Sequence, residues 1–320
     1  MFTSAILILQ LGAVSPSIPL EQALRAQDLH DADPQACRAA GLSVQVLGSG
    51  GPVAEGPRAG TSYLVRVDGV PRLLVDIGSG AYLRFAEAGA SLSELDGILL
   101  THLHADHSGD LVSVLMSGGF EDRTAPLSLL GPDAAPRFPA ASHFLASLFA
   151  HDGGPYSYLG GYLDGTEGKP LLKPSDVPTA NGDAAPVTFQ FAHNLTVTAL
   201  PVHHGAVPAL GYRIQLGEQS VVITGDQSAF SEGFERSLAG SRPQLLFAHH
   251  VIPEGPGQPR GLHRAPESIG ELAVKLGAGR LVLAHNMNRS LASLDEGLAA
   301  IGMNYAGPVS VAFDLDCYAP

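Results

Sequence analysis

The chain has 320 residues, of which 45% are hydrophobic and 15% charged, so its composition is that of a globular protein rather than a disordered one. Its 31 acidic and 18 basic side chains give a formal net charge of -13, and no run of Lys or Arg is longer than one residue. A surface of this charge repels polyanions, and the sequence gives no sign of the local basic patch that a nucleic-acid substrate would need.

Residues 1–38 form an N-terminal segment that precedes the first predicted strand. The apolar stretch Ala5–Val14 is too short to span a bilayer but has the length of the hydrophobic part of a signal peptide, although no Lys or Arg precedes it. We therefore favour a signal peptide and a periplasmic or secreted protein, with a cytoplasmic protein as the alternative. An N-terminal amphipathic helix is the other interpretation, because Leu20–Asp28 also has a helical pattern.

Cys37 and Cys317 are the only cysteines, and they lie just outside the first and last predicted strands. The two ends of a domain are often close together, so these residues could form a disulfide in an oxidising compartment. Two unpaired buried thiols are an equal alternative, because pairing cannot be deduced from sequence.

Short apolar runs bounded by turn residues recur along the chain and are typical of β-strands. The predicted strands are Leu42–Leu47, Ser62–Val67, Arg72–Asp76, Asp96–Leu100, Val187–Phe191, Leu195–Val202, Leu210–Gln215, Ser220–Thr224, Gln244–Ala248, Arg280–Ala284 and Val309–Phe313. Helical patterns cover Ala81–Ala88, Asp106–Met116, Ser231–Leu238, Pro266–Leu276 and Leu291–Ile301. Residues 39–320 are therefore expected to form an α/β fold of four layers, an αββα sandwich of two mixed β-sheets flanked by helices.

The middle of the chain, residues 118–185, is rich in Pro and Gly and too long for a plain loop. We interpret it as a lid-like insertion beside the functional site, with a surface excursion without function as the alternative. Its aromatic residues would either line an apolar wall of the site or form a small core of the insertion itself. These residues are Phe149, Tyr156, Tyr158 and Tyr162.

Histidine and aspartate side chains gather in the sequence THLHADHSGD, which begins at Thr101. His102 and His104 alternate in an extended segment and so point the same way, and a helix that begins with Asp106 and His107 turns both of these toward the same place. Neutral imidazole and carboxylate groups are the ligands of zinc and, less selectively, of iron or manganese. The motif therefore predicts a metal site.

Three later strands also end in potential ligands. A single histidine at a strand end is usually structural, but three such strands together with the cluster supply enough ligands for two metal ions that share one carboxylate. The residues that follow these strands are His203 and His204, then Asp226, and finally His285.

THLHADH resembles the HxHxDH signature of the metallo-β-lactamase-fold hydrolases. The segments LGSGGP and LLVDIGSG upstream, and PVHHGAVPALGYRI, VVITGD and HRAPESIGELAVKLGAGRLVLAH downstream, resemble the ribonuclease Z-like and arylsulfatase-like branch of that superfamily. The resemblance extends from about Leu42 to His285 and implies the metallo-β-lactamase fold for residues 39–320.

The resemblance also implies two Zn2+ ions per chain, with Mn2+ or Fe2+ as other candidates. His102, His104 and His204 would bind one ion. Asp106, His107 and His285 would bind the second, and Asp226 would bridge both. His204 is preferred over His203 because a Pro-Val-x-His-Gly context surrounds the ligand in the family, although one extra residue before the Gly-Tyr-Arg segment leaves His203 as an alternative.

His263, which opens the sequence HRAPE, occupies the place of a family histidine that contacts the scissile group; a structural loop histidine is the alternative. His249 and His250 have no certain counterpart, so a supporting or substrate-facing role for them is a guess. We expect a metal-bridging hydroxide to attack the substrate, Asp106 or Asp226 to accept a proton, and His263 to protonate or stabilise the leaving oxygen.

The net charge favours a small-molecule substrate over transfer RNA, the substrate of ribonuclease Z itself. We expect an ester, such as a phosphodiester or an aryl sulfate, with a lactone or carboxylic ester as the alternative. We expect neither a nucleic-acid nor a membrane partner, and we leave a homodimer open. A di-iron redox protein is the rival within the fold, but that family has a Glu where this chain has His104. A non-catalytic binding protein would be expected to lose ligands, whereas the whole set is present.

Overall fold

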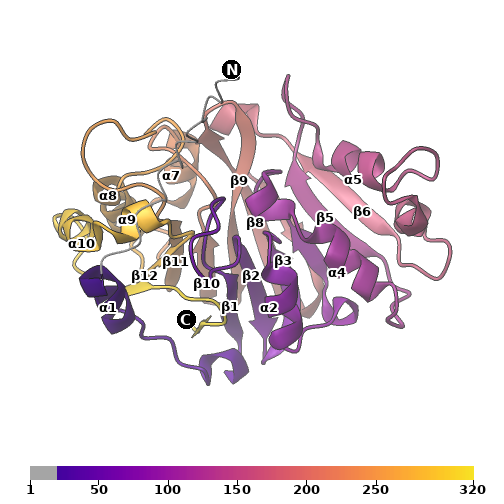
Figure 1. Cartoon of the computed structure of the whole chain (residues 1–320), viewed down its shortest axis with the longest axis horizontal. Coiled ribbons are helices and arrows are strands. Elements are labelled where there is room, and N and C mark those ends of the chain that lie inside the picture. Colours follow the sequence, from indigo (N-terminus) through magenta and orange to yellow (C-terminus); the bar gives the residue numbers. More distant parts are fainter. Residues whose placement is uncertain (1–19) are drawn as a thin grey trace, which may run out of the picture.

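The computed structural model describes residues 20–320 and contains two seven-stranded sheets packed face to face (Figure 1). The first sheet has, in spatial order, β14 (Cys317–Tyr318), β1 (Leu42–Gly48), β2 (Ser62–Val67), β3 (Val70–Val75), β4 (Gly97–Leu99), β5 (Leu127–Pro132) and β6 (Leu172–Val177). The second has β13 (Val309–Val311), β12 (Arg280–Ala284), β11 (Leu245–His249), β10 (Gln219–Ile223), β9 (Val207–Leu216), β8 (Leu195–His204) and β7 (Val187–Gln190).

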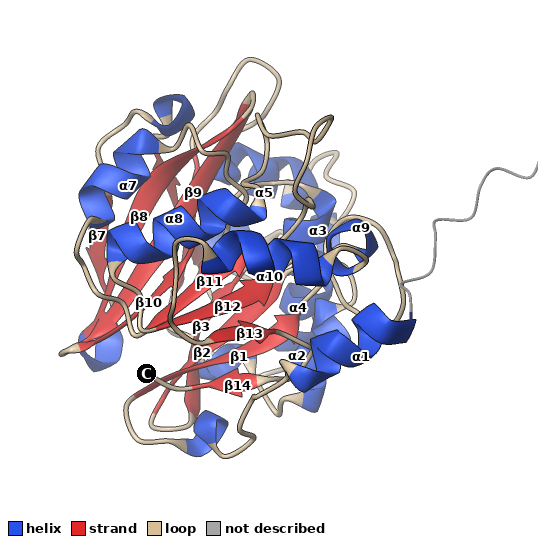
Figure 2. Cartoon of the chain, turned by 90° about the vertical axis from the view of Figure 1, so that its left-hand side faces the viewer, coloured by secondary structure: helices blue, strands red, loops and turns tan. Residues whose placement is uncertain are grey.

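Helices cover the outer face of each sheet, so the four-layer αββα sandwich expected from the sequence is confirmed. Figure 2 shows α8 and α10 lying across the second sheet. The helices are α1 (Leu20–Asp28), α2 (Ala81–Glu87), α3 (Ala105–Ser108), α4 (Leu111–Gly118), α5 (Ala141–Phe149), α6 (Gly161–Asp164), α7 (Glu232–Leu238), α8 (Pro266–Leu276), α9 (Asn288–Leu291) and α10 (Leu294–Gly302).

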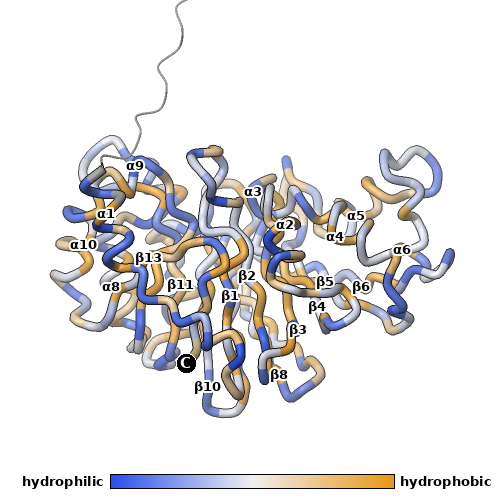
Figure 3. The backbone as a smooth tube through the Cα atoms, turned by 60° about the horizontal axis from the view of Figure 1, so that its bottom comes forward, coloured by the Kyte–Doolittle hydropathy of each residue, from blue (hydrophilic) through white to orange (hydrophobic). Residues whose placement is uncertain are grey.

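Three apolar layers hold the sandwich together. One lies between the sheets and includes Tyr63 and Phe247, one lies between the first sheet and α2, α4 and α5, and one lies between the second sheet and α7, α8 and α10. Apolar residues are concentrated in the strands, while the turns are mostly hydrophilic (Figure 3). Because both faces of both sheets are covered, central strands such as β11 are buried at every residue, which explains their nearly continuous apolar sequences.

Strand direction places the ends of many strands at one edge of the sandwich. β3 and β4 are parallel in the first sheet, and β10, β11 and β12 are parallel in the second. β8 is antiparallel to β9, which is antiparallel to β10, so β8 and β10 run the same way. The carboxyl ends of these strands, where ligand-type residues follow in the sequence, therefore meet at the same edge.

The segment 118–185 is not a separate insertion, which corrects that part of our interpretation; its place beside the functional site stays a prediction. It contributes β5 and β6, which extend the first sheet in parallel with β4. The helix α5 of this segment packs on the same sheet, and its Phe149 is fully buried there with Tyr162. Phe149 and Tyr162 therefore belong to the core and do not line the site, whereas Tyr158 of the same segment is exposed.

The N-terminal helix predicted as one alternative is present as α1, while the apolar stretch interpreted as a signal peptide lies outside the described residues. Within residues 20–320, no helix is both long and apolar enough to cross a membrane. Cys37 and Cys317 are joined by a disulfide, with Cα atoms 5.3 Å apart, which is within the usual range. The bond ties the segment after α1 to β14, so the indigo and yellow ends of the chain lie side by side in Figure 1.

We predict that replacing both cysteines with serine lowers the free energy of unfolding by about 2–5 kcal/mol, because the bond closes a long loop in the unfolded chain. Denaturant titration of the oxidised wild type and the C37S/C317S variant would measure the difference. Reduced wild type is the control and should match the variant. Thiols that titrate in the denatured protein without prior reduction would contradict the disulfide.

Candidate metal centre

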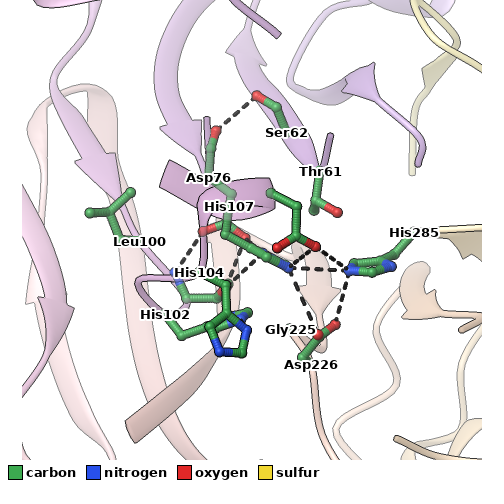
Figure 4. Close-up of polar contacts among 12 residues, drawn as sticks. Thr61, Ser62, Asp76, Leu100, His102, His104, His107, Gly225, Asp226 and His285 are labelled. Carbon is green, nitrogen blue, oxygen red and sulfur yellow. Dashed lines mark hydrogen bonds and ion pairs between the residues drawn. The ribbon is translucent and has the colours of Figure 1, made fainter. Parts of the chain in front are cut away.

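Side chains from several strand ends converge at the edge described above (Figure 4). The segment between β4 and α4 supplies His102, His104, Asp106 and His107. The ends of β8, β10 and β12 bring His204, Asp226 and His285. Every residue predicted as a ligand therefore lies in the cluster, and most of them are buried.

The first group consists of His102, His104 and His204, whose ligand atoms all lie within 4.8 Å of one another. The Nε2 atom of His102 is 2.9 Å from Nδ1 of His104. Burial lowers the pKa of both rings, so they are neutral near pH 7 and their nitrogens can bind a metal ion.

The second group consists of Asp106, His107 and His285. The Nε2 atoms of the two histidines are 3.2 Å apart, and they lie 3.5 Å and 3.3 Å from the same oxygen of Asp106. Two ligands of a tetrahedral zinc ion with bonds of about 2.0–2.1 Å are separated by roughly 3.3 Å. The residues of this group therefore fit a divalent metal ion.

Asp226 lies between the two groups and is almost fully buried. Its Oδ2 atom is 3.7 Å from Nε2 of His204 in the first group and 3.8 Å from Nε2 of His107 in the second. Burial by itself raises the pKa of this carboxyl, but the surrounding histidines, His285 foremost, hold it well below its usual value. The position and charge of Asp226 suit a carboxylate that bridges two cations.

Of the two adjacent histidines at the end of β8, the structure places His204 in the cluster and His203 outside it. Successive residues of a strand point to opposite sides. The Nδ1 atom of His204 donates to the carbonyl oxygen of Leu262 at 2.9 Å, which leaves Nε2 directed toward Asp226. The His203 ring instead bonds Ser228 Oγ at 2.8 Å.

Asp76, at the end of β3, is part of the site, although sequence reasoning did not assign it a role. It accepts hydrogen bonds from the backbone and side chain of Thr101, both at 2.7 Å, and from Nδ1 of His107 at 2.8 Å. Burial opposes protonation of His107, but Asp76 outweighs it and raises the pKa of that ring to about 9. At this pKa the metal-free ring holds a proton on both nitrogens near pH 7; the contact keeps the one on Nδ1, so Nε2, which faces the second group, is the nitrogen that would give up its proton to bind a metal ion. Its position after a buried strand, like that of Asp226, was the available sequence signal.

Two glycines permit the close approach of loops to this cluster. A Cβ atom on Gly78 would lie 2.2 Å from the carbonyl oxygen of Asp106, and one on Gly51 would lie 2.4 Å from Cε1 of His285. Either contact would displace a ligand-type residue. This explains one glycine of each of the segments LGSGGP and LLVDIGSG on steric grounds.

His263 lies at the edge of the cluster, as predicted. Its side chain is 12% exposed, and its Nδ1 is 3.8 Å from Oδ2 of Asp226. Burial lowers the pKa of His263 to about 4, and the charge of Asp226 only partly opposes this. The neighbouring Arg264 bonds both Gln227 and Glu235, which anchors the loop that carries His263.

His249 and His250, which have no clear counterpart in the resemblance, are both buried but have different partners. His249 contacts Asp226 directly, with Nδ1 2.7 Å from Oδ1, and burial lowers the pKa of its ring to about 3. His250 faces Asn286, with Nδ1 3.2 Å from Oδ1, and so lies behind the cluster. Only His249 reaches a predicted ligand.

Comparison with known proteins places this arrangement in a family. Residues 56–285 match the family described as the metallo-beta-lactamase superfamily. A ribonuclease Z from Mycobacterium sp. (strain KMS) is 31% identical over 259 residues, which are 76% of this chain and 84% of the relative.

Solved structures agree with the fold. The metallo-beta-lactamase fold protein YhfI from Bacillus subtilis covers 87% of this chain and 99% of its own, with a TM-score of 0.64 and 20% identity. Human tRNase Z, short form, covers 87% of this chain and 98% of its own, with a TM-score of 0.62 and 18% identity. The family match spans the strand ends that carry the cluster, and the chain therefore belongs to the metallo-beta-lactamase superfamily, whose members include metal-dependent hydrolases.

Proposed function

We propose that the chain is a dinuclear zinc hydrolase that cleaves a small-molecule ester, and that an anionic phosphodiester is the substrate class that fits best. The observation that carries this proposal is the pair of ligand groups joined by Asp226. When bound there, zinc ions would supply Lewis acidity, which favours deprotonation of water near neutral pH and stabilises charge on the scissile group. Mn2+ or Fe2+ could serve in the same positions.

Side chains of the site could accept the proton of the attacking water and stabilise the leaving oxygen. Asp226 and Asp106 stay ionised, because the pKa of Asp106 is lowered to about 2 by its hydrogen bond and proximity to histidines, against the effect of burial. Either carboxylate could accept the proton of the attacking water. His263 is neutral near pH 7, so it would donate a hydrogen bond to the leaving oxygen rather than transfer a proton readily.

The rim of the cluster has both apolar and cationic groups. The ring of Phe138 lies 6.3 Å from that of His104, and Leu262, beside His204, is 38% exposed. Arg289 is exposed and donates through Nε to the carbonyl oxygen of Val251. Its positive charge adds to the effect of burial on His263. This combination suits an ester that has an organic group and a negative charge.

RNA is the second candidate substrate, because the relatives named ribonuclease Z favour it. The charge of this chain argues against it, since several basic side chains are already neutralised by carboxylates. Arg260, in the loop that carries His263, is one of these and pairs with Glu254 at 3.0 Å. Pairing of this kind weakens the positive potential that a phosphate backbone would meet there.

We also propose that the protein works in an oxidising compartment, either the periplasm or the outside of the cell. The disulfide between Cys37 and Cys317 supports this, because such bonds are rare in reducing compartments. Blocking free thiols in intact cells and then mapping the peptides of the unreduced protein would test it. Cysteines found blocked rather than linked would contradict the proposal.

The metal proposal predicts about two zinc ions per chain. We expect Asp226→Ala to lose metal from both groups and to have the lowest activity of the ligand variants, because both groups face this carboxylate. Elemental analysis after gel filtration measures the number of zinc ions per chain. Asp295→Ala, which removes an exposed carboxylate, is the control and should keep both ions. A zinc content of the wild-type protein below about half an ion per chain would contradict the proposal.

The substrate proposal predicts turnover of bis(4-nitrophenyl) phosphate above that of a phosphotriester, an aryl sulfate, a lactone and precursor transfer RNA. Arg289→Gln should raise the KM of the diester about tenfold, because a hydrogen bond between charged groups contributes about 1.5–3 kcal/mol, and should leave neutral esters unchanged. Arg260→Gln is the matched control, since that charge is already paired. Faster cleavage of the transfer RNA than of any small ester would favour the second candidate.

His263→Ala should keep its zinc while kcat falls by roughly 10²- to 10³-fold, because a hydrogen-bond donor to the leaving oxygen is lost. The loss should be similar for nitrophenyl and alkyl leaving groups, since the neutral ring is expected to stabilise charge. A much larger loss on the alkyl ester would instead indicate general acid catalysis. Turnover near that of the wild type on both substrates would remove His263 from the site.

A further inference from the structure

His249 ends β11 and lies in the interior next to Asp226, between two polar partners. Its side chain is 2% exposed. Its Nδ1 is 2.7 Å from Oδ1 of Asp226, and its Nε2 is 3.0 Å from the hydroxyl of Tyr63. Tyr63 is fully buried on β2 of the opposite sheet. A hydrogen-bonded chain therefore connects Asp226 to the core between the two sheets.

The direction of these hydrogen bonds follows from the number of protons available. A neutral imidazole has one N–H and one acceptor nitrogen. If Nδ1 carries the proton, it donates to the carboxylate, and Nε2 accepts the proton of the Tyr63 hydroxyl. If Nε2 carries the proton, the Tyr63 hydroxyl has no acceptor among the described residues, although it is buried. An unsatisfied buried hydroxyl costs about 1–3 kcal/mol, so the first arrangement is favoured.

We propose that His249 is a positioning residue of the metal centre, which holds Oδ1 of Asp226 through its Nδ1–H while Tyr63 fixes its tautomer. The inference rests on the proposed metal site. With Oδ1 held between His249 and His285, whose Nε2 is 3.4 Å from it, Oδ2 is the oxygen that faces His107, His204 and His263, at 3.8, 3.7 and 3.8 Å. His249 thereby fixes the rotation of the carboxylate, so that Oδ2 faces members of both ligand groups and Oδ1 faces His285.

The competing possibility is that His249 itself binds a metal ion, because it forms a potential ligand group with Asp226 and His285. In that role Nδ1 would bind the ion and could not carry a proton. The proton would then be on Nε2, which leaves the Tyr63 hydroxyl without an acceptor. The two roles therefore require opposite tautomers, and the tautomer decides between them.

Long-range ¹H–¹⁵N correlation spectra of the full chain, labelled in its histidines, would identify the tautomer. His249→Asn assigns the resonance of the ring. We expect a protonated Nδ1 and an unprotonated Nε2, both in the metal-free protein and after addition of zinc. A protonated Nε2, or an Nδ1 that loses its proton and shifts when zinc is added, would overturn the proposal.

Zinc affinity, measured by competition with a chelator, gives a second test. His249→Ala should weaken affinity about 10- to 100-fold, and His249→Asn should restore most of it, because the asparagine amide can donate from nearly the position of Nδ1. Phe247→Leu is the control: it lies on the same strand, packs against Tyr63 with ring centroids 5.4 Å apart, and touches no ligand. Its zinc affinity should stay within about threefold of the wild type, well below the loss of a supporting contact.

Equal losses in the alanine and asparagine variants, with a fall in the number of ions bound, would assign His249 as a ligand and overturn the proposal. Losses of affinity in Phe247→Leu as large as those in His249→Ala would show a merely structural role and would also overturn it. A wild type that binds no zinc would contradict the proposed function itself, whereas the tautomer can be determined without metal. The two failures are therefore distinguishable.

Discussion

Asp226 carries a negative charge in the interior, and the rest of the site is arranged around the compensation of that charge. A buried carboxylate without partners would become neutral. Here five histidines from separate segments of the chain lie within 4 Å of it, and its pKa is held well below the usual value in spite of burial. In the proposed holoprotein, two cations would take over much of this compensation. The energetic cost of burying Asp226 is thus the reason that the histidines must converge on it.

The fold brings the ligand-type residues together, because they follow strands that all end at one edge of the sandwich. The two sheets contribute different parts: the first brings the histidine cluster of residues 102–107, and the second brings His204, Asp226 and His285. Asp76 and His285 have positive φ angles of 54° and 52°, which are uncommon for residues other than glycine. Such backbone strain is typical of sites where the chain must turn sharply to present a side chain.

Several of these rings have one nitrogen committed to the protein, and this leaves the other free for the centre of the cluster. Asp76 holds His107, and the carbonyl oxygen of Leu262 holds His204. His249 differs, since both of its nitrogens have protein partners. Hydrogen-bond geometry therefore distinguishes His107 and His204, which have a nitrogen free to bind a metal ion, from His249, which supports the bridging carboxylate.

Much of this architecture could be predicted from sequence, for identifiable reasons. Central strands such as β11 and β12 have continuous apolar runs, and His102 to His107 closely follow the apolar strand β4. β5 and β6 were missed because their sequences, LSLLGP and LKPSDV, contain residues typical of loops. Pro174 and the exposed Lys173 are tolerated because β6 is at the edge of its sheet. The description of residues 118–185 as an insertion separate from the main sheet was wrong for this reason.

The supporting contacts were beyond sequence reasoning because their partners are distant along the chain. Asp76 and His107 are 31 residues apart, and Tyr63 and His249 are 186 residues apart and on different sheets. No local pattern specifies such a pair. The choice between His203 and His204 was different, because alternation along β8 places them on opposite sides once the inward face of the strand is known.

The location of bound metal tests the central claim most directly. Crystals of the full chain grown with zinc, measured on both sides of the zinc absorption edge, would give the positions of the ions. The account predicts two anomalous peaks, one among His102, His104 and His204 and one among Asp106, His107 and His285, with Asp226 contacting both. A single peak held by Asp226, His249 and His285, or no peak in the cluster, would contradict it.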